Sequence, residues 1–200
     1  MAGIMGKVNV LLEWMIKLTY INILWGIFTI VGVGIFGIVP ATVSLFAVMR
    51  QWLKGNEPKT FEVFKTYYIK EFFKSNKLGF CLTVLGFILY FDLSFFRSMN
   101  HIIFLILTYF TFLLIVLYLS LLLIIFPLYV HQNLKISQYL KNGFYIVMSN
   151  PMVPVLIFAG VLGINALIFF VPGLIPFFAI SAPALFIMWF ANKLFIKLHQ

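Results

Sequence analysis

Four stretches of this chain contain no aspartate, glutamate, lysine or arginine: residues 18–49, 78–91, 98–134 and 142–192. A helix needs about 20 residues, each rising 1.5 Å, to cross the hydrocarbon core of a bilayer. Charged residues make up 10% of the 200 residues, whereas an ordinary soluble domain is about 25% charged. The low charge excludes a soluble globular domain, and the 25 phenylalanines exclude a disordered chain. The sequence predicts an all-α, polytopic membrane protein.

Breaks in these stretches divide the second half of the chain into candidate spans. The longest stretch has to break at Val171-Pro172-Gly173-Leu174-Ile175-Pro176, which cannot continue a helix. The second stretch reaches spanning length only if it includes Asp92 and ends at Arg97. The expected spans are 78–97, 102–130, 152–170 and 174–192.

The first stretch allows two interpretations. Its 32 residues are too few for two crossings, but 12–54 is long enough if the charged residues near its ends lie at the membrane interface. A turn is then expected among Gly32, Gly34, Gly37 and Pro40, where a helix is weakest. The segment forms either one span or a hairpin of two helices, over 12–35 and 39–54.

The basic residues fall mainly on one side of the expected spans. Residues 50–77 contain seven, and the connection after the third span and the C-terminal tail contain two each, whereas the opposite connections contain only Arg97. The positive-inside rule places the basic group, with loops 50–77 and 131–142 and the C-terminus, in the cytoplasm. Lys7 and Lys17 join that group if the chain has six spans, which we favour; five spans would put the N-terminus outside.

Residues 60–77 have the pattern of an amphipathic helix at the cytoplasmic membrane surface. An aromatic stripe recurs at helical spacing, and lysines that could meet anionic headgroups accompany it. The segment is either a surface anchor or an element that docks another protein's cytoplasmic domain, and residues 134–148 could act similarly. The candidate contacts to lipid or a partner are Phe61, Phe64, Tyr68, Phe72, Lys65, Lys70, Lys74 and Lys77.

Polar residues within the apolar stretches are few. Asp92 is the single acid in an apolar run, and it could pair with Arg97 at the external end of a span or line a substrate or proton path. Other polar side chains are expected to join helices by hydrogen bonds. These are Asn22, Ser120, Asn165, Ser181 and Asn192.

The sequence contains no recognisable catalytic, metal or cofactor motif. Gly32-Val-Gly34-Ile-Phe-Gly37 matches the dinucleotide-binding pattern only formally, because that motif follows a strand and these glycines lie in an apolar run. His101, His131 and His199 are expected in different connections or ends, too far apart for one metal. The chain is therefore expected to be neither an enzyme nor a nucleic-acid-binding protein.

The N-terminal half resembles a known family. Gly37-Ile-Val-Pro40-Ala41-Thr42 is followed by Phe46, Arg50 and Gly55, and then by Phe61-x-x-Phe64 and Phe72-Phe73-Lys74-Ser75. This order, over roughly 12–85, resembles the YesL-like family of small bacterial integral membrane proteins, which have no assigned biochemical activity. Genes of that family commonly lie beside ABC-type sugar importers and glycan-degrading enzymes. The resemblance implies a cell-membrane location and a role near carbohydrate uptake.

Two functions are consistent with these observations. The first is a non-catalytic accessory or regulatory subunit associated with an ABC-type carbohydrate importer. The alternative is an autonomous transporter or channel for small solutes. In that case Asp92 and Arg97 would lie at an outer vestibule, and Gly37–Pro40 would form a broken-helix element.

Overall fold

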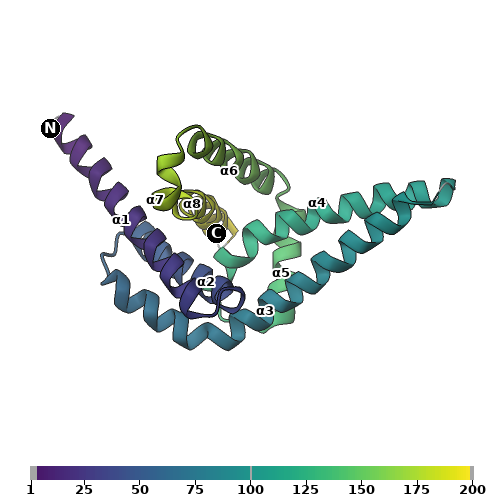
Figure 1. The fold of residues 1–200 in the computed structure, drawn as a ribbon, viewed down its shortest axis with the longest axis horizontal. Helices are drawn as coiled ribbons and strands as arrows, with labels where there is room; N and C mark the ends of the chain where they lie inside the picture. The colour runs from purple at the N-terminus through teal and green to yellow at the C-terminus, as the bar shows by residue number, and fades with distance from the viewer. Residues whose placement is uncertain (1–3, 100, 199–200) are drawn as a thin grey trace.

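The structure is a computed structural model that describes residues 4–99 and 101–198. All regular structure in these residues is helical, which confirms the all-α class (Figure 1). Five helices are long and apolar enough to cross a membrane, and a sixth span arises if the bent pair at the C-terminus counts as one. The elements are α1 (Ile4–Val31), α2 (Ile35–Leu53), α3 (Thr60–Arg97), α4 (Ile102–His131), α5 (Ile136–Ser149), α6 (Met152–Phe170), the 3-10 helix η1 (Pro172–Leu174), α7 (Ile175–Phe178) and α8 (Ser181–Leu198).

The first apolar stretch forms a hairpin of two helices, α1 and α2. The turn between them uses positive φ at Val33 and at Gly34, 59° and 69°. Gly37 then lies against the carbonyl of Thr29, so a side chain there would collide with the backbone of α1. Pro40 lies inside α2 and does not break it, so the expected broken-helix element at Gly37–Pro40 is absent.

Helix α2 forms the centre of the molecule. It packs against α1, α3, α4 and α8, and Ala41, Val43 and Leu45 are fully buried. Its hydroxyl groups bond locally or to α1: Thr42 and Ser44 donate to carbonyls of α2, and Thr42 Oγ1 accepts from Trp25 Nε1 at 3.1 Å. The Gly-Ile-Val-Pro-Ala-Thr motif, with its Gly37, Pro40, Ala41 and Thr42, therefore holds the α1–α2 hairpin together.

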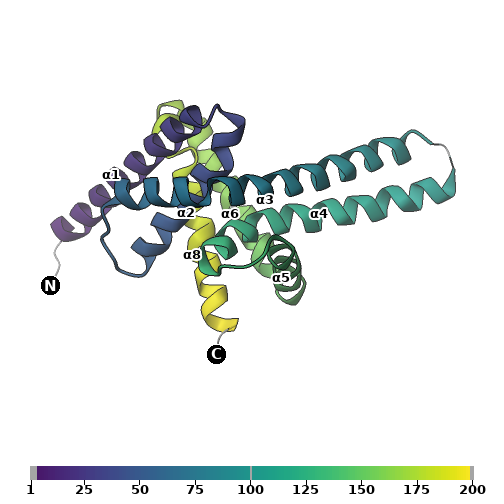
Figure 2. The ribbon, with the colours of Figure 1, turned by 90° about the horizontal axis from the view of Figure 1, so that it is seen from below.

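Helix α3 is one continuous element of 38 residues, about 57 Å long at 1.5 Å per residue. The sequence predicted a surface helix over 60–77 and a separate span over 78–97, but the structure has no break between them. Nothing in Asn76-Lys77-Leu78 stops a helix, and α3 contains no proline. Figures 1 and 2 show α3 and α4 as a hairpin that extends far beyond the other helices.

The last span is broken between the short helix α7 and the longer helix α8. Helices α7 and α8 meet at 56°, which leaves the first N–H groups of α8 without partners in their own helix. Asn22 of α1 supplies them: its Oδ1 accepts from the amides of Ile180 and Ser181, each at 3.1 Å, and its Nδ2 donates to the Pro176 carbonyl at 2.8 Å. Asn22 thus joins the first and last spans.

Candidate functional site

The aromatic stripe of 60–77 lies inside the protein. Phe64 is fully buried and Tyr68 is 6% exposed, because both rings pack on Phe28 of α1, at centroid distances of 5.1 and 4.9 Å. The Tyr68 hydroxyl donates to the Phe28 carbonyl at 2.9 Å. Phe72 is half-buried and Phe61 exposed. The centre of the stripe, Phe64 and Tyr68, therefore does not face lipid or a partner as expected, because it forms the contact between α1 and α3. For the exposed Phe61 the expectation stays a prediction.

The four lysines of this segment do not share one environment. Lys65, Lys70 and Lys77 are exposed, whereas Lys74 is half-buried. Its ammonium donates to Asn133 Oδ1 at 2.6 Å, and lies 5.4 and 5.5 Å from the ring centroids of Tyr129 and Tyr139. Lys74 is thus held on an aromatic surface by a cation–π contact.

Lys74 lies at the edge of a polar cavity of about 220 Å³. The cavity forms where the C-terminal ends of α2 and α4 meet the first half of α3 and the start of α5. It combines cationic and tyrosine side chains with one carboxylate. Its lining residues are Arg50, Tyr67, Lys70, Glu71, Lys74, Tyr129, Val130, His131, Gln132, Asn133 and Tyr139.

Two stacked tyrosines form the inner wall of this cavity. The rings of Tyr129 and Tyr139 lie 4.8 Å apart and 22° from parallel. The Tyr129 hydroxyl donates to Glu71 Oε2 at 2.7 Å. The Tyr139 hydroxyl donates to the Gln132 carbonyl at 2.7 Å and accepts from the Leu134 amide at 3.0 Å, which fixes the connection between α4 and α5.

Tyr139 stays neutral in this wall. Burial raises the pKa of its phenol and the nearby Glu71 carboxylate raises it further, while the Leu134 N–H opposes the shift. The phenol therefore keeps its proton across the physiological pH range, which the bond to Gln132 requires. The inner wall provides hydroxyl groups but no negative charge of its own.

Arg50 closes the other side of the cavity. Its Nη1 donates to the Val130 carbonyl at 2.7 Å, so it caps the C-terminal end of α4. Its Nε is buried and has no hydrogen-bond partner. Counting formal charges, Arg50, Lys70 and Lys74 outweigh Glu71, so the cavity is cationic.

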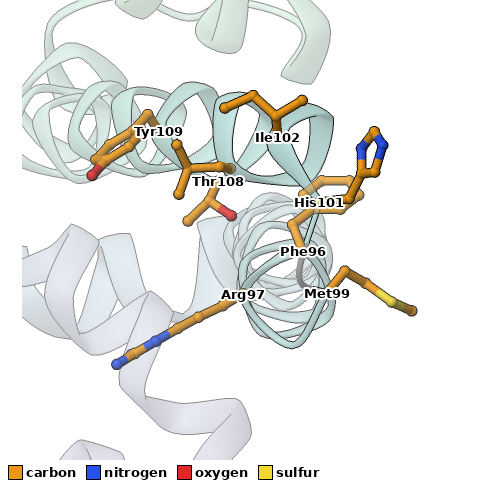
Figure 3. A pocket seen from close by; sticks show the side chains of 8 residues that line it. Phe96, Arg97, Met99, His101, Ile102, Thr108 and Tyr109 are labelled. Carbon is orange, nitrogen blue, oxygen red and sulfur yellow. The ribbon is translucent and has the colours of Figure 1, made fainter.

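A second cavity, of about 460 Å³, lies at the tip of the α3–α4 hairpin. Figure 3 shows that its polar groups do not converge, because the side chains of Arg97 and His101 point away from each other. His101 is used locally: its Nδ1 accepts from the Ile103 amide at 3.3 Å and caps α4.

Asp92 and Arg97 do not form the expected pair. No salt bridge joins them among the described residues. Positions five apart on a helix point about 140° away from each other at 3.6 residues per turn. Asp92 also does not line the cavity at the hairpin tip, so the structure gives no support to an outer vestibule built on these two residues.

A third hollow, of about 560 Å³, is apolar. It lies between the first half of α1, the end of α2, α6 and α8, and Trp14 and Trp189 line it. No ionisable side chain lines it. Of these three hollows, the cavity at the ends of α2 and α4 is the one where polar groups from four helices converge.

Comparison with known proteins identifies the family of this chain. A family model described as a protein of unknown function, DUF624, matches residues 18–93. The uncharacterised protein YteU of Bacillus subtilis (strain 168) is 34% identical over 99% of this chain and 89% of its own length. The chain belongs to the YesL-like family. YesL itself, from the same organism, is 31% identical over 94% of this chain and 88% of its own length, and YesV is 32% identical over 92% and 89%.

The YesL-like match confirms the resemblance seen in the sequence. No solved structure is similar. The family model covers α2 and most of α3, and so it includes Arg50, Lys70, Glu71 and Lys74 on one side of the cavity. The residues that complete the cavity come from α4 and α5, beyond the matched range.

Sequence reasoning proposed two residues of this cavity as contacts, Lys70 and Lys74. It named Arg50 only within the family motif and His131 only as a histidine too far from the others to share a metal. It did not single out Glu71, Tyr129, Asn133 or Tyr139, because their proximity depends on α4 returning beside α3, 58 residues along the chain from Glu71 to Tyr129. The one available signal was Glu71, a carboxylate within a lysine-rich segment.

Proposed function

We propose that this chain is a non-catalytic accessory or regulatory subunit of an ABC-type carbohydrate importer in the bacterial cell membrane. The family resemblance supplies the expected partner. The observation that carries the proposal is how the polar residues of the spans are used. They bond to neighbouring helices or within their own helix, and among the residues that the structure describes they form no row of polar groups that could guide a solute.

Three contacts between helices illustrate this use. Asn22 bonds to α7 and α8, Tyr68 to the Phe28 carbonyl, and the Tyr118 hydroxyl to the Leu82 carbonyl at 2.9 Å. The remaining hydroxyl and amide groups bond mainly to carbonyls in their own helices, as do Thr42, Ser44, Thr83, Thr108, Ser120 and Asn165. The bonds between helices stabilise a scaffold, each by on the order of 0.6 kcal/mol. The bonds within a helix satisfy polar groups that would otherwise be open to a solute.

The proposed docking element is the outer part of the α3–α4 hairpin, whose apolar side chains point outward. Only 22% of the most apolar window of α3 is buried within the chain, against 61% for α2. The exposed faces carry aliphatic and aromatic side chains. The exposed rings include Phe80, Phe87, Tyr90, Phe91, Tyr109 and Phe110. We propose that the membrane-spanning subunit of the importer covers part of this surface and lipid covers the rest.

The proposal places the ends of α2, α4 and α8 at the cytoplasmic face. These ends lie together: Arg50 reaches the Val130 carbonyl, and the rings of His131 and Phe195 are 4.7 Å apart. Basic residues are concentrated at these ends, as the positive-inside rule expects for a cytoplasmic side.

Orientation can be tested by cysteine labelling. Replacing the single cysteine by Cys81→Ser gives a cysteine-free chain, into which Ser98→Cys at the hairpin tip or Ser137→Cys in α5 is introduced; both positions are exposed. An impermeant maleimide should label Ser98→Cys in intact cells and Ser137→Cys only after permeabilisation. The reverse pattern would invert the topology.

The accessory role is tested by purification of the tagged chain from its native membrane in mild detergent. Importer subunits should co-purify with the wild type and with Phe169→Ala, which removes an exposed ring on α6. They should be depleted with Phe87→Ala and Phe110→Ala combined, which removes exposed rings of the hairpin. Failure of any importer subunit to co-purify, together with normal growth on glycans after gene deletion, would reject the role.

One observation favours the alternative, an autonomous transporter: transporters often build their substrate sites at broken helices, and the α7–α8 pair is broken. Here, however, Asn22 already bonds to backbone groups on both sides of the break. Solute uptake by the purified chain alone in liposomes, abolished by Asp92→Asn, would favour the transporter.

A further inference from the structure

We propose that the cavity at the ends of α2 and α4 is a binding site for a phosphate-ester anion. This inference does not depend on the accessory role, because the cavity lies apart from the exposed outer part of the α3–α4 hairpin. The first observation behind it is the positive charge around the cavity. Arg50, Lys70 and Lys74 come from two helices and line one cavity of about 220 Å³.

These cations are not neutralised by direct contact with carboxylates. The salt bridges among the described residues involve Lys17 and Lys59, and none involves Arg50, Lys70 or Lys74. The one carboxylate of the cavity, Glu71, accepts a hydrogen bond from the Tyr129 hydroxyl instead. Three cations around one cavity with a single carboxylate, which forms a salt bridge with none of them, leave an excess of positive charge, and this excess favours an anionic ligand.

The second observation is a hydrogen-bond donor without a partner. The Nε of Arg50 is buried without a partner, while Nη1 of the same guanidinium is fixed on the Val130 carbonyl. Leaving a buried donor unsatisfied costs about 1–3 kcal/mol, and more for a charged group. An oxyanion that accepts from Nε would remove that cost and would gain a charge-assisted bond.

The number of donors favours phosphate over carboxylate. A carboxylate presents two oxygens, both on one side of its carbon. A phosphate monoester presents three terminal oxygens, and a diester presents two terminal and two ester oxygens arranged tetrahedrally, so either can meet an arginine and two lysines from different directions. Lys74 is already positioned for this by Asn133 and the two tyrosine rings, so little side-chain entropy is lost when an anion binds.

The position of the cavity leaves two possible sources of the phosphate ester, a lipid headgroup and a soluble molecule. It lies at the ends of two candidate spans, where basic pockets between helices bind the headgroups of anionic lipids. Lys70 is exposed, so a soluble phosphate ester could also enter from the aqueous side. The shared chemistry is the phosphate ester, and the experiment separates the two sources.

The test uses the detergent-purified full chain and native mass spectrometry. Phosphatidylglycerol should be retained, and diacylglycerol, which lacks the phosphate, should not. In parallel, sn-glycerol 3-phosphate is added and the thermal stability is measured. A lipid site retains phosphatidylglycerol with no effect of glycerol 3-phosphate, whereas a soluble-anion site gains thermal stability from glycerol 3-phosphate, which also competes with the lipid.

Lys70→Gln is the deciding variant, because Lys70 is exposed and makes no hydrogen bond that folding would need. Its loss should weaken retention of the phosphate ester about tenfold, which corresponds to about 1.4 kcal/mol. Lys65→Gln and Lys77→Gln make the same charge change on the same helix outside the cavity, and both should bind as the wild type. Equal losses in all three variants, or equal retention of diacylglycerol and phosphatidylglycerol with no effect of glycerol 3-phosphate, would overturn the proposal.

Discussion

Helix α2 and the outer part of the α3–α4 hairpin are both long, apolar and helical, yet they differ in what surrounds them. Within the chain α2 is covered by four helices, and its rings are stacked in place, such as Phe46 on Phe126 at 6.2 Å. In the outer hairpin α3 and α4 contact each other along one side, and their other faces are exposed (Figure 2). Apolar composition alone therefore does not tell a buried helix from one that meets lipid or another protein.

The difference predicts a gradient of mutational effects from the α2-centred core to the hairpin. Phe64→Ala should have the largest effect, because it removes a fully buried ring from the α1–α3 contact. We expect a loss of about 4 kcal/mol in the free energy of unfolding, measured in mixed detergent micelles. Phe73→Ala on the same helix removes a ring that is 86% exposed and should change little. Equal effects of the two would mean that the stripe does not pack inside the protein.

Gly37→Val comes next and tests the core from the α2 side. The new side chain would collide with the backbone of Thr29, which has no flexible end that can move away. Overpacking of this kind costs about 3 kcal/mol, and the same unfolding measurement should show it. Gly163→Ala in α6, where no atom lies near the added methyl group, serves as the control.

Asn22→Leu should have a smaller effect, about 2 kcal/mol, because it leaves buried backbone groups at the α7–α8 break without partners. The matched change Asn165→Leu removes an exposed amide that bonds only within its own helix, and it should cost under about 0.5 kcal/mol. If both variants unfold alike, Asn22 does not hold the broken span.

Tyr118→Phe in the hairpin seam should have the smallest effect. It removes one hydrogen bond to the Leu82 carbonyl, and bonds between membrane helices are worth on the order of 0.6 kcal/mol. An unfolding free energy lowered as much as by Gly37→Val would show that the seam is as tightly coupled as the core, and the contrast between the two regions would fail.

The helical class and the approximate number of apolar helices could be predicted from sequence, because both depend on local composition and on breakers such as Pro172-Gly173. The environment of 60–77 could not. Its aromatic period indicates one apolar face, but sequence does not say whether lipid or Phe28 of α1 covers that face. The cavity escaped prediction for the same reason, since Tyr129 and Tyr139 reach Lys74 only through the tertiary packing of α4 and α5 on α3.

The continuity of α3 has a mechanical consequence. A helix without proline or a break bends little, so it behaves as a lever with its long arm in the hairpin and its short arm at Phe61–Lys74. We expect a tilt of the hairpin, whether set by bilayer thickness or by a bound protein, to move Lys70 and Lys74 relative to Arg50, which belongs to α2. The length of α3 would then link the far tip to the cationic cavity.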